Sequence, residues 1–250
     1  MLIRAVAFLL LAVFPLADVR LNVTCRDSDS IYIPTNLAGT YFQVTNDVWG
    51  DPKSEHVQCV SGGNGGLGWQ WSKPRFTYAP YFPHISLNVS QITPKRVTEI
   101  SRLQVIASLV IAASGTYNLA FDVWITADLN GIQVTDEVMV WLLWTNRTLT
   151  RVPITTTDGF NNYGYMTYMD RWRFHAFFLL ANTIPFVVDL KRLLMFAGVD
   201  GYIRELSLGN EVFSGVGRTK IYAINIIMDQ LTVGNSGACY VPSCANIFNP

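Results

Sequence analysis

The sequence predicts an all-β fold, a β-jelly-roll sandwich of two antiparallel sheets with one short helix. Two observations predict this class: several segments alternate apolar and polar residues with a period of two, and Gly- and Asn-rich clusters separate them. The clearest strand segments are 40–49, 117–126, 137–144 and 221–228. A chain of 250 residues is long enough for one large core, and all-β sandwiches of this size often form a single domain.

The remaining elements follow from local patterns along the chain. The strand segments are rich in β-branched and aromatic residues, whereas 61–68 and 158–162 are rich in Gly and Asn and predict turns. The stretch 188–197 has apolar residues at helical spacing and ends before Gly198, so it predicts the helix. The apolar segment 177–188 is interrupted by Asn and Pro, and predicts a core strand.

The N-terminal residues 1–17 have the pattern of a secretory signal peptide. Arg4 supplies the positive charge, and the apolar stretch 5–16 is too short for a good transmembrane span. Cleavage leaves a single domain, 18–250, secreted and free of the membrane. Pro15 is unusual at its place before the cleavage site, so an uncleaved anchor is the alternative.

Two further patterns fit export from the cell. The chain has four cysteines, an even number, which suggests two disulfides. Three pairings are open, and we favour Cys25–Cys59 and Cys239–Cys244, the second of which closes a short loop. Zinc is the weaker alternative because no tight Cys-x-x-Cys or nearby His pair is present. N-glycosylation sequons begin at Asn22, Asn88 and Asn146.

The composition excludes one class of partner and favours another. Lys plus Arg and Asp plus Glu are 18 each, so the chain has no basic field to hold a nucleic acid. Seven Trp and eleven Tyr in a chain with 14% charged residues suit a sugar-binding surface, because the apolar face of a sugar stacks on an aromatic ring. The three His lie in no Ser-His-Asp or metal-ligand context, and we expect no metal and no cofactor.

The segment 135–144 places a carboxylate on an unusual strand face. Side chains alternate along a strand, so Glu137, Met139 and Trp141 share one face, and the apolar residues between them form the other. A strand face that carries a carboxylate, a thioether and an indole is typical of the lining of an active-site cleft. The alternative is that Glu137 lies on a solvated face or at a strand edge.

Two more acidic residues lie in similar surroundings. In the segment 117–124, Asp122 shares a face with Asn118 and Trp124, and could hydrogen-bond Glu137 if the two strands are neighbours. The alternative is an ordinary exposed Asp. Glu211 lies among glycines, which allow a ligand to approach closely, but this segment alone is weak support.

Five segments together resemble a known family. Asn46-Asp-Val-Trp-Gly50, Trp69-Gln-Trp71, Phe121-Asp-Val-Trp124, Asp136-Glu-Val-Met-Val-Trp-Leu142 and Gly209-Asn-Glu-Val-Phe-Ser-Gly215 resemble motifs of glycoside hydrolase family 12, the endoglucanases and xyloglucanases. They occur in the family's order, and the match runs from about residue 41 to residue 228.

The resemblance implies a retaining endo-β-1,4-glucanase that cuts internal bonds of a β-glucan. Glu137 would be the nucleophile, Glu211 the acid/base and Asp122 the residue that holds Glu137. The implied substrate-binding residues are Asn46, Trp49, Trp69, Trp71, Met139 and Trp141. Trp69 and Trp71 share a face that could instead belong to the core. We expect a monomer that acts on polysaccharide.

Departures from the family pattern leave the substrate preference open. Asp47 and Asp136 stand where the family has Asn and Tyr, and 81–84 is Tyr-Phe-Pro-His in place of Ser-Tyr-Pro-Asn. The loop 145–151 lacks the family's Gly-rich composition. Xyloglucan is therefore a second candidate substrate. A family 11 xylanase, which also uses two glutamates on a jelly roll, is a second candidate enzyme. A jelly-roll lectin or degenerate glucanase is the candidate without catalytic activity.

Overall fold

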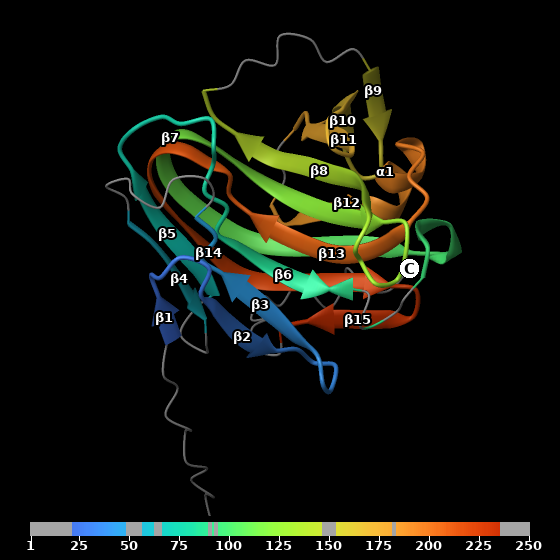
Figure 1. Ribbon diagram of the computed structural model, residues 1–250, viewed down its shortest axis with the longest axis horizontal. Coiled ribbons are helices and arrows are strands. Elements are labelled where there is room, and N and C mark those ends of the chain that lie inside the picture. The colour runs from blue at the N-terminus through green and yellow to red at the C-terminus, as the bar shows by residue number, and fades with distance from the viewer. Residues whose placement is uncertain are drawn as a thin grey trace, which may run out of the picture.

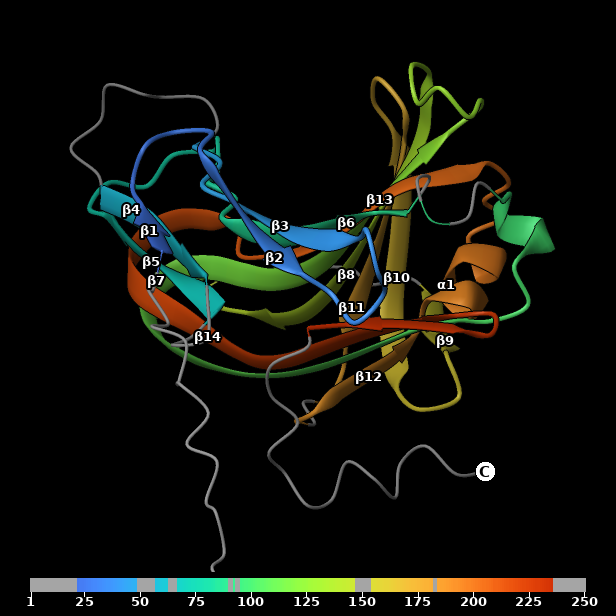
Figure 2. The same ribbon diagram turned by 90° about the horizontal axis from the view of Figure 1, so that it is seen from below.

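Strands make up most of the computed structural model, which describes residues 22–48, 57–62, 67–89, 92, 95–146, 154–181 and 184–235. They form two layers, and Figure 2 shows the long strands β7 and β14 curving beneath β2, β3 and β6. The predicted all-β jelly roll is therefore confirmed. Residues 1–17, Trp49, Cys239 and Cys244 lie outside the described residues.

The strands divide between the layers by their hydrogen-bonded neighbours (Figure 1). The outer layer contains β1 (Asn22–Thr24), β4 (Val57–Gly62), β5 (Leu67–Lys73), β14 (Val212–Met228), β12 (Phe186–Asp189) and β15 (Leu231–Gly234). The inner layer contains β2 (Ser30–Pro34), β3 (Tyr41–Thr45), β6 (His84–Asn88), β13 (Tyr202–Gly209), β8 (Val134–Trp144), β11 (Arg173–Leu179), β10 (Asn162–Met169) and β9 (Ile154–Thr157). A 3-10 turn covers Val97–Glu99.

Strand β7 (Leu103–Thr126) belongs to both layers and is longer than the sequence pattern predicts. Its first part pairs with β12 and β14, and its last part pairs with β8 and β13. Gly115 of β7 lies opposite Gly215 of β14, and both have positive φ angles. A Cβ at Gly115 would lie 2.6 Å from the Gly215 Cα, so only glycine fits where these two strands meet.

Two details of the predicted fold are corrected. Every described strand pair is antiparallel except β8 and β11, which run parallel. The helix is shorter than 188–197: α1 covers Leu190–Phe196, because Val188 still belongs to β12 and Asp189 caps the helix by accepting a hydrogen bond from the Arg192 amide. Gly198 follows the helix in the left-handed conformation, as its end signal predicts.

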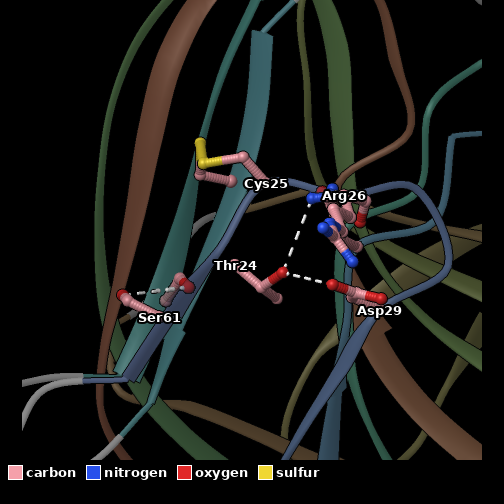
Figure 3. The surroundings of a disulfide bond; sticks show 8 residues. Thr24, Cys25, Arg26, Asp29 and Ser61 are labelled. Atoms are coloured by element: carbon pink, nitrogen blue, oxygen red, sulfur yellow. Dashed lines mark hydrogen bonds between the residues drawn. A yellow bond between two sulfur atoms is a disulfide. The ribbon is translucent and has the colours of Figure 1, made fainter.

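The Cys25–Cys59 disulfide is confirmed, and it ties the end of β1 to β4 (Figure 3). Beside it, the Thr24 hydroxyl donates a hydrogen bond to Asp29 Oδ2 at 2.6 Å, which links the end of β1 to the residue before β2. The described residues include no helix that is both long and apolar enough to cross a membrane.

Replacing both Cys25 and Cys59 by serine should lower the free energy of unfolding by about 3–4 kcal/mol. The cysteines are 34 residues apart, so the bond removes considerable entropy from the unfolded chain. Urea unfolding of the variant and the wild type measures the difference. Peptide mapping of the wild type provides the control, and free thiols at both positions would contradict the pairing.

Candidate active site

Strand β8 presents the predicted carboxylate face to a cleft. Val138, Val140 and Leu142 are fully buried in the main core, whereas Glu137, Met139 and Trp141 line the cleft on the opposite face. The period-two interpretation of this strand is therefore correct, and Glu137 is not on a solvated edge.

The cleft has two arms that meet at the predicted catalytic pair. The large arm has a volume of about 840 Å³ and the small arm about 170 Å³. Both arms are lined by Pro80, Trp124, Glu137, Met139 and Glu211. The large arm adds an aromatic wall of Trp141, Tyr168, Trp172, Phe174, Phe178 and Phe213. The small arm adds Asp47, Phe82, His84, Asp122, Glu205 and Ser207.

Glu137 is held by a residue that the sequence did not indicate. The Trp172 indole donates a hydrogen bond from Nε1 to Glu137 Oε2 at 2.6 Å. Burial raises the pKa of Glu137 to about 7, the Trp172 hydrogen bond opposes this rise, and the charge of Glu211 adds to it. The two glutamates are therefore close enough to influence each other's protonation, as a nucleophile and an acid/base require.

Trp172 is positioned by hydrogen bonds of the neighbouring residues on the core side of the sheet. The residue after it, Arg173, donates to Asp136 Oδ1 at 2.6 Å, and buried His175 makes a 3.1 Å hydrogen bond to the same oxygen. These bonds pin the start of β11 to β8 in parallel register. Asp136, a departure from the family pattern, thus anchors strand β11, and Trp172 just before this strand contacts Glu137.

Asn118 positions Glu211 through reciprocal hydrogen bonds. Its side-chain amide donates to Glu211 Oε2, and its Oδ1 accepts from the Glu211 amide at 3.0 Å. The backbone of Asn118 also donates to the Glu211 carbonyl at 3.0 Å. Glu211 lies between β13 and β14, where these three bonds fix both its backbone and its carboxyl group.

Asp122 lines the small arm but is arranged differently from the prediction. It accepts a hydrogen bond from Trp124 Nε1 at 2.9 Å, and no hydrogen bond to Glu137 is present among the described residues. Its other oxygen, Oδ1, is buried without a partner. Burial, with the charges of Glu137 and Glu211, raises the pKa of Asp122 well above its usual value, which favours its neutral form.

Three predicted substrate-binding residues do not reach the cleft. Trp69 and Trp71 are each 3% exposed and belong to the main core, because β5 turns that face toward the inner layer. Trp69 donates to Asn210 Oδ1 at 2.8 Å and so supports the segment that carries Glu211. Asn46 is fully buried and donates to the Arg26 carbonyl at 2.8 Å. Met139 and Trp141 line the cleft as predicted.

Sequence patterns did not indicate Trp172, Asn118 as a partner of Glu211, or the aromatic wall from β10 and β11. The alternation of Phe174, Ala176 and Phe178 was a usable signal, since these residues share the cleft face of β11. No group of three or more His, Cys, Asp or Glu in the described ranges is arranged to hold a metal ion.

Replacing Trp172 by phenylalanine should shift the acidic limb of the kcat/KM profile to higher pH. The attack that the family resemblance implies requires ionised Glu137, so activity should fall as pH falls through the pKa of Glu137, about 7. Losing a donor to the carboxylate raises that pKa further, and activity at pH 5 should fall roughly tenfold. Rates at pH 5–9 give the profile. Trp144→Phe, which changes an indole that does not line the cleft, is the matched control. Superimposable profiles for wild type and Trp172→Phe would contradict this role.

We compared the sequence and the fold with those of known proteins. No protein-family model matches the sequence. Endoglucanase S of Pectobacterium parmentieri is 28% identical over 141 residues, which is 48% of this chain and 50% of that protein. The chain therefore spans about half the length of the curated relative that it matches.

Solved structures match over much more of the chain. A ligand-bound family 12 xyloglucanase from Bacillus licheniformis has a TM-score of 0.72 at 22% identity, covering 83% of this chain and 99% of that one. The chain has the family 12 glycoside hydrolase fold. An endoglucanase from Rhodothermus marinus shows the same family 12 fold at a TM-score of 0.66 and 20% identity, covering 83% of this chain and 99% of that one.

A more distant match extends the family 12 comparison. The xyloglucanase domain of a type three effector from Sinorhizobium fredii, in complex with cellobiose, has a TM-score of 0.60 at 15% identity. It covers 78% of this chain and 97% of that chain. Nearly the whole of each of these three solved structures thus has a counterpart here, which confirms the resemblance at the level of the fold.

Proposed function

We propose that this protein is a secreted, retaining endo-β-1,4-glucanase. The observation that carries the proposal is the pair Glu137 and Glu211, which lies where the two arms of the cleft meet. A cleft that continues on both sides of the reacting groups suits a polymer cut at an internal bond. The names of the compared proteins, endoglucanases and xyloglucanases of family 12, support this class of reaction.

The reaction needs no group beyond the two glutamates. Ionised Glu137 attacks the anomeric carbon, the bond to the leaving oxygen breaks, and protonated Glu211 gives that oxygen its proton. The ionised Glu211 then takes a proton from water, which attacks the same carbon and releases Glu137. Two inversions give net retention. The raised pKa of Asp122 favours its protonated form, which limits the negative charge around the pair.

The large arm supports a chain of glucose units as the substrate. Its aromatic wall offers flat apolar faces, against which the C–H faces of sugar rings can stack. Exposed Tyr78 and half-exposed Tyr168 extend this lining to the rim of the arm. Binding along several sugars supplies energy that can distort the ring at the scissile bond, so short substrates should lose turnover as well as affinity.

Secretion is part of the proposal. The Cys25–Cys59 disulfide favours an oxidising compartment. The asparagines of all three sequons, Asn22, Asn88 and Asn146, are exposed, which is compatible with glycosylation. Sequencing the N-terminus of the exported protein tests cleavage after residue 17.

The wild type should cleave unbranched β-1,4-glucan and xyloglucan faster than xylan, with the first product in the β configuration. The physical reason is double displacement by two carboxyl groups in a cleft with many stacking surfaces. Reducing-sugar release from the three polymers, with the anomer followed by proton NMR, measures both features. We expect unbranched glucan to be preferred over xyloglucan.

Other results in this assay would indicate one of the alternative functions. Faster release from xylan would indicate a family 11-like specificity, and an α-anomer as first product would exclude the double displacement. Binding of glucan with no release of reducing sugar would identify a lectin or a degenerate glucanase.

A further inference from the structure

The small arm contains a polar group that the proposed reaction does not use. His84 of β6 and Glu205 of β13 line this arm together with Asp47, next to Glu137 and Glu211. A β-bulge between Ile203 and Glu205 interrupts the pairing of β13 with β7, and Glu205 then pairs opposite Trp124 on the cleft face. Three segments that are far apart in the sequence therefore place Asp47, His84 and Glu205 in the lining of the small arm.

The imidazole of His84 is fixed on three sides. Its ring stacks on Phe82 with 4.9 Å between centroids, and Nδ1 lies 2.7 Å from the Phe82 carbonyl oxygen, to which it donates. Across the strand pair, a Cβ at Gly209 would lie 2.7 Å from His84 Cβ. The absence of a side chain at Gly209 leaves the space that His84 occupies, so its second nitrogen has a defined direction.

That second nitrogen, Nε2, faces Glu205 without bonding to it. Nε2 lies 4.0 Å from Glu205 Oε1, beyond hydrogen-bond distance. Because the proton of the neutral ring is on Nδ1, Nε2 is an acceptor, and the Glu205 carboxylate is also an acceptor. Burial lowers the pKa of His84, with the charge of Asp47 opposing, which favours the neutral ring.

Glu205 keeps acceptor capacity for a ligand. Burial raises its pKa, and a hydrogen bond from the Ser86 side chain is among the contacts that oppose this rise. A carboxylate has about four acceptor sites, so one hydroxyl donor leaves most of them unused. The two acceptors, Nε2 of His84 and the Glu205 carboxylate, therefore need further donors from elsewhere.

We propose that His84 and Glu205 together bind two hydroxyl groups of one sugar residue in the small arm, and so select a residue that is unsubstituted there. Adjacent sugar hydroxyls are two neutral donors on one ring edge, which complements two acceptors 4.0 Å apart. A substituted hydroxyl has no proton to donate and would leave a buried acceptor unpaired. The proposal rests on the proposed function for its sugar ligand.

The two arms then have different tasks. The large arm contacts sugar faces through aromatic rings, which tolerates variation in the hydroxyls. The small arm contacts the hydroxyl groups of the sugar through His84 and Glu205, and this contact does not tolerate variation in those hydroxyls. The charged and titratable groups that face His84 are Asp47 and Glu205, and those further along the arm are Asp122, Glu137 and Glu211. None of these offers a fixed N–H donor that could satisfy Nε2 in place of a ligand.

Calorimetric binding of a thio-linked cellotetraose, which is not hydrolysed, tests this pair. His84→Asn keeps an amide that can donate to the Phe82 carbonyl but removes Nε2, and should weaken binding roughly three- to tenfold. Glu205→Gln introduces a donor that can bond to Nε2 and close the pair, with a similar loss. His84→Gln, which keeps an acceptor near the Nε2 position, should lose less. Glu99→Gln, an exposed glutamate outside the cleft, is the matched control.

Monodeoxy versions of the same tetraose provide a measurement that a merely structural histidine would not affect. One of them should bind the wild type about three- to tenfold more weakly, while His84→Asn should not distinguish it from the parent compound. Equal discrimination by both proteins, or unchanged affinity in both His84→Asn and Glu205→Gln, would overturn the proposal. So would the absence of any binding to the folded wild type. Because these are binding measurements, an inactive wild type that still shows the expected pattern would refute the proposed hydrolysis and leave this inference standing.

Discussion

Replacing Glu137 by alanine is expected to lower kcat on a soluble β-glucan by at least about 10³-fold, a loss of about 4 kcal/mol of transition-state stabilisation. The side chain lies where both arms of the cleft meet, and its Oε2 is oriented by Trp172 at 2.6 Å. Without it no glycosyl-enzyme can form. Rates on the polymer and on an aryl cello-oligosaccharide measure the loss.

Azide identifies the role of Glu137 independently of the size of the loss. In Glu137→Ala, azide can enter from the side that the carboxylate vacates, so any rescued product should be the α-glycosyl azide. Glu99→Ala provides a matched control, because that glutamate is exposed and outside the cleft. Full activity in Glu137→Ala would show that the motif match is accidental.

Replacing Glu211 by alanine is expected to lower kcat on the polymer by about 10²–10⁴-fold, the usual contribution of general acid–base catalysis. The loss should be smaller for an aryl glycoside with a good leaving group, because that oxygen needs little help from an acid. Comparing the two substrates separates loss of the acid from loss of the fold. A loss that does not depend on the leaving group would contradict the role.

In Glu211→Ala, azide should give the β-glycosyl azide. Glu137 still forms the intermediate, and azide attacks it without the help of a general base. The reverse stereochemistry in the two variants would mean that the two roles are exchanged. Asn118→Asp offers a related check, since it replaces the amide that donates to Glu211 Oε2 with a second carboxyl group and should weaken the positioning of the acid.

The features that the sequence determined are those set by local periodicity and by covalent chemistry. Period-two alternation placed Val138 and Val140 in the core and Glu137 on the other face, and the structure agrees. The even number of cysteines indicated disulfides, and of the three possible pairings the structure confirms the favoured bond Cys25–Cys59. The end of the helix at Gly198 followed from the left-handed conformation that glycine accepts.

Periodicity does not say whether an aromatic strand face packs in the core or lines a binding surface. Trp69 and Trp71 share a face, and the same pattern fits a substrate platform or a core wall. The choice was made by how β5 packs against the inner layer, which buries both indoles. The same ambiguity affected Asn46, whose side chain turns inward to a backbone carbonyl.

Only the tertiary structure decided which residues support the two glutamates. Trp172 reaches Glu137 across 35 positions of sequence, and Asn118 reaches Glu211 across 93. The first contact depends on the parallel register of β11 with β8, and the second on the pairing of β7 with the start of β14. Strand registers of this kind are set by the packing of the whole core. The sequence therefore determined the two glutamates as candidate catalytic residues, and the fold determined their partners.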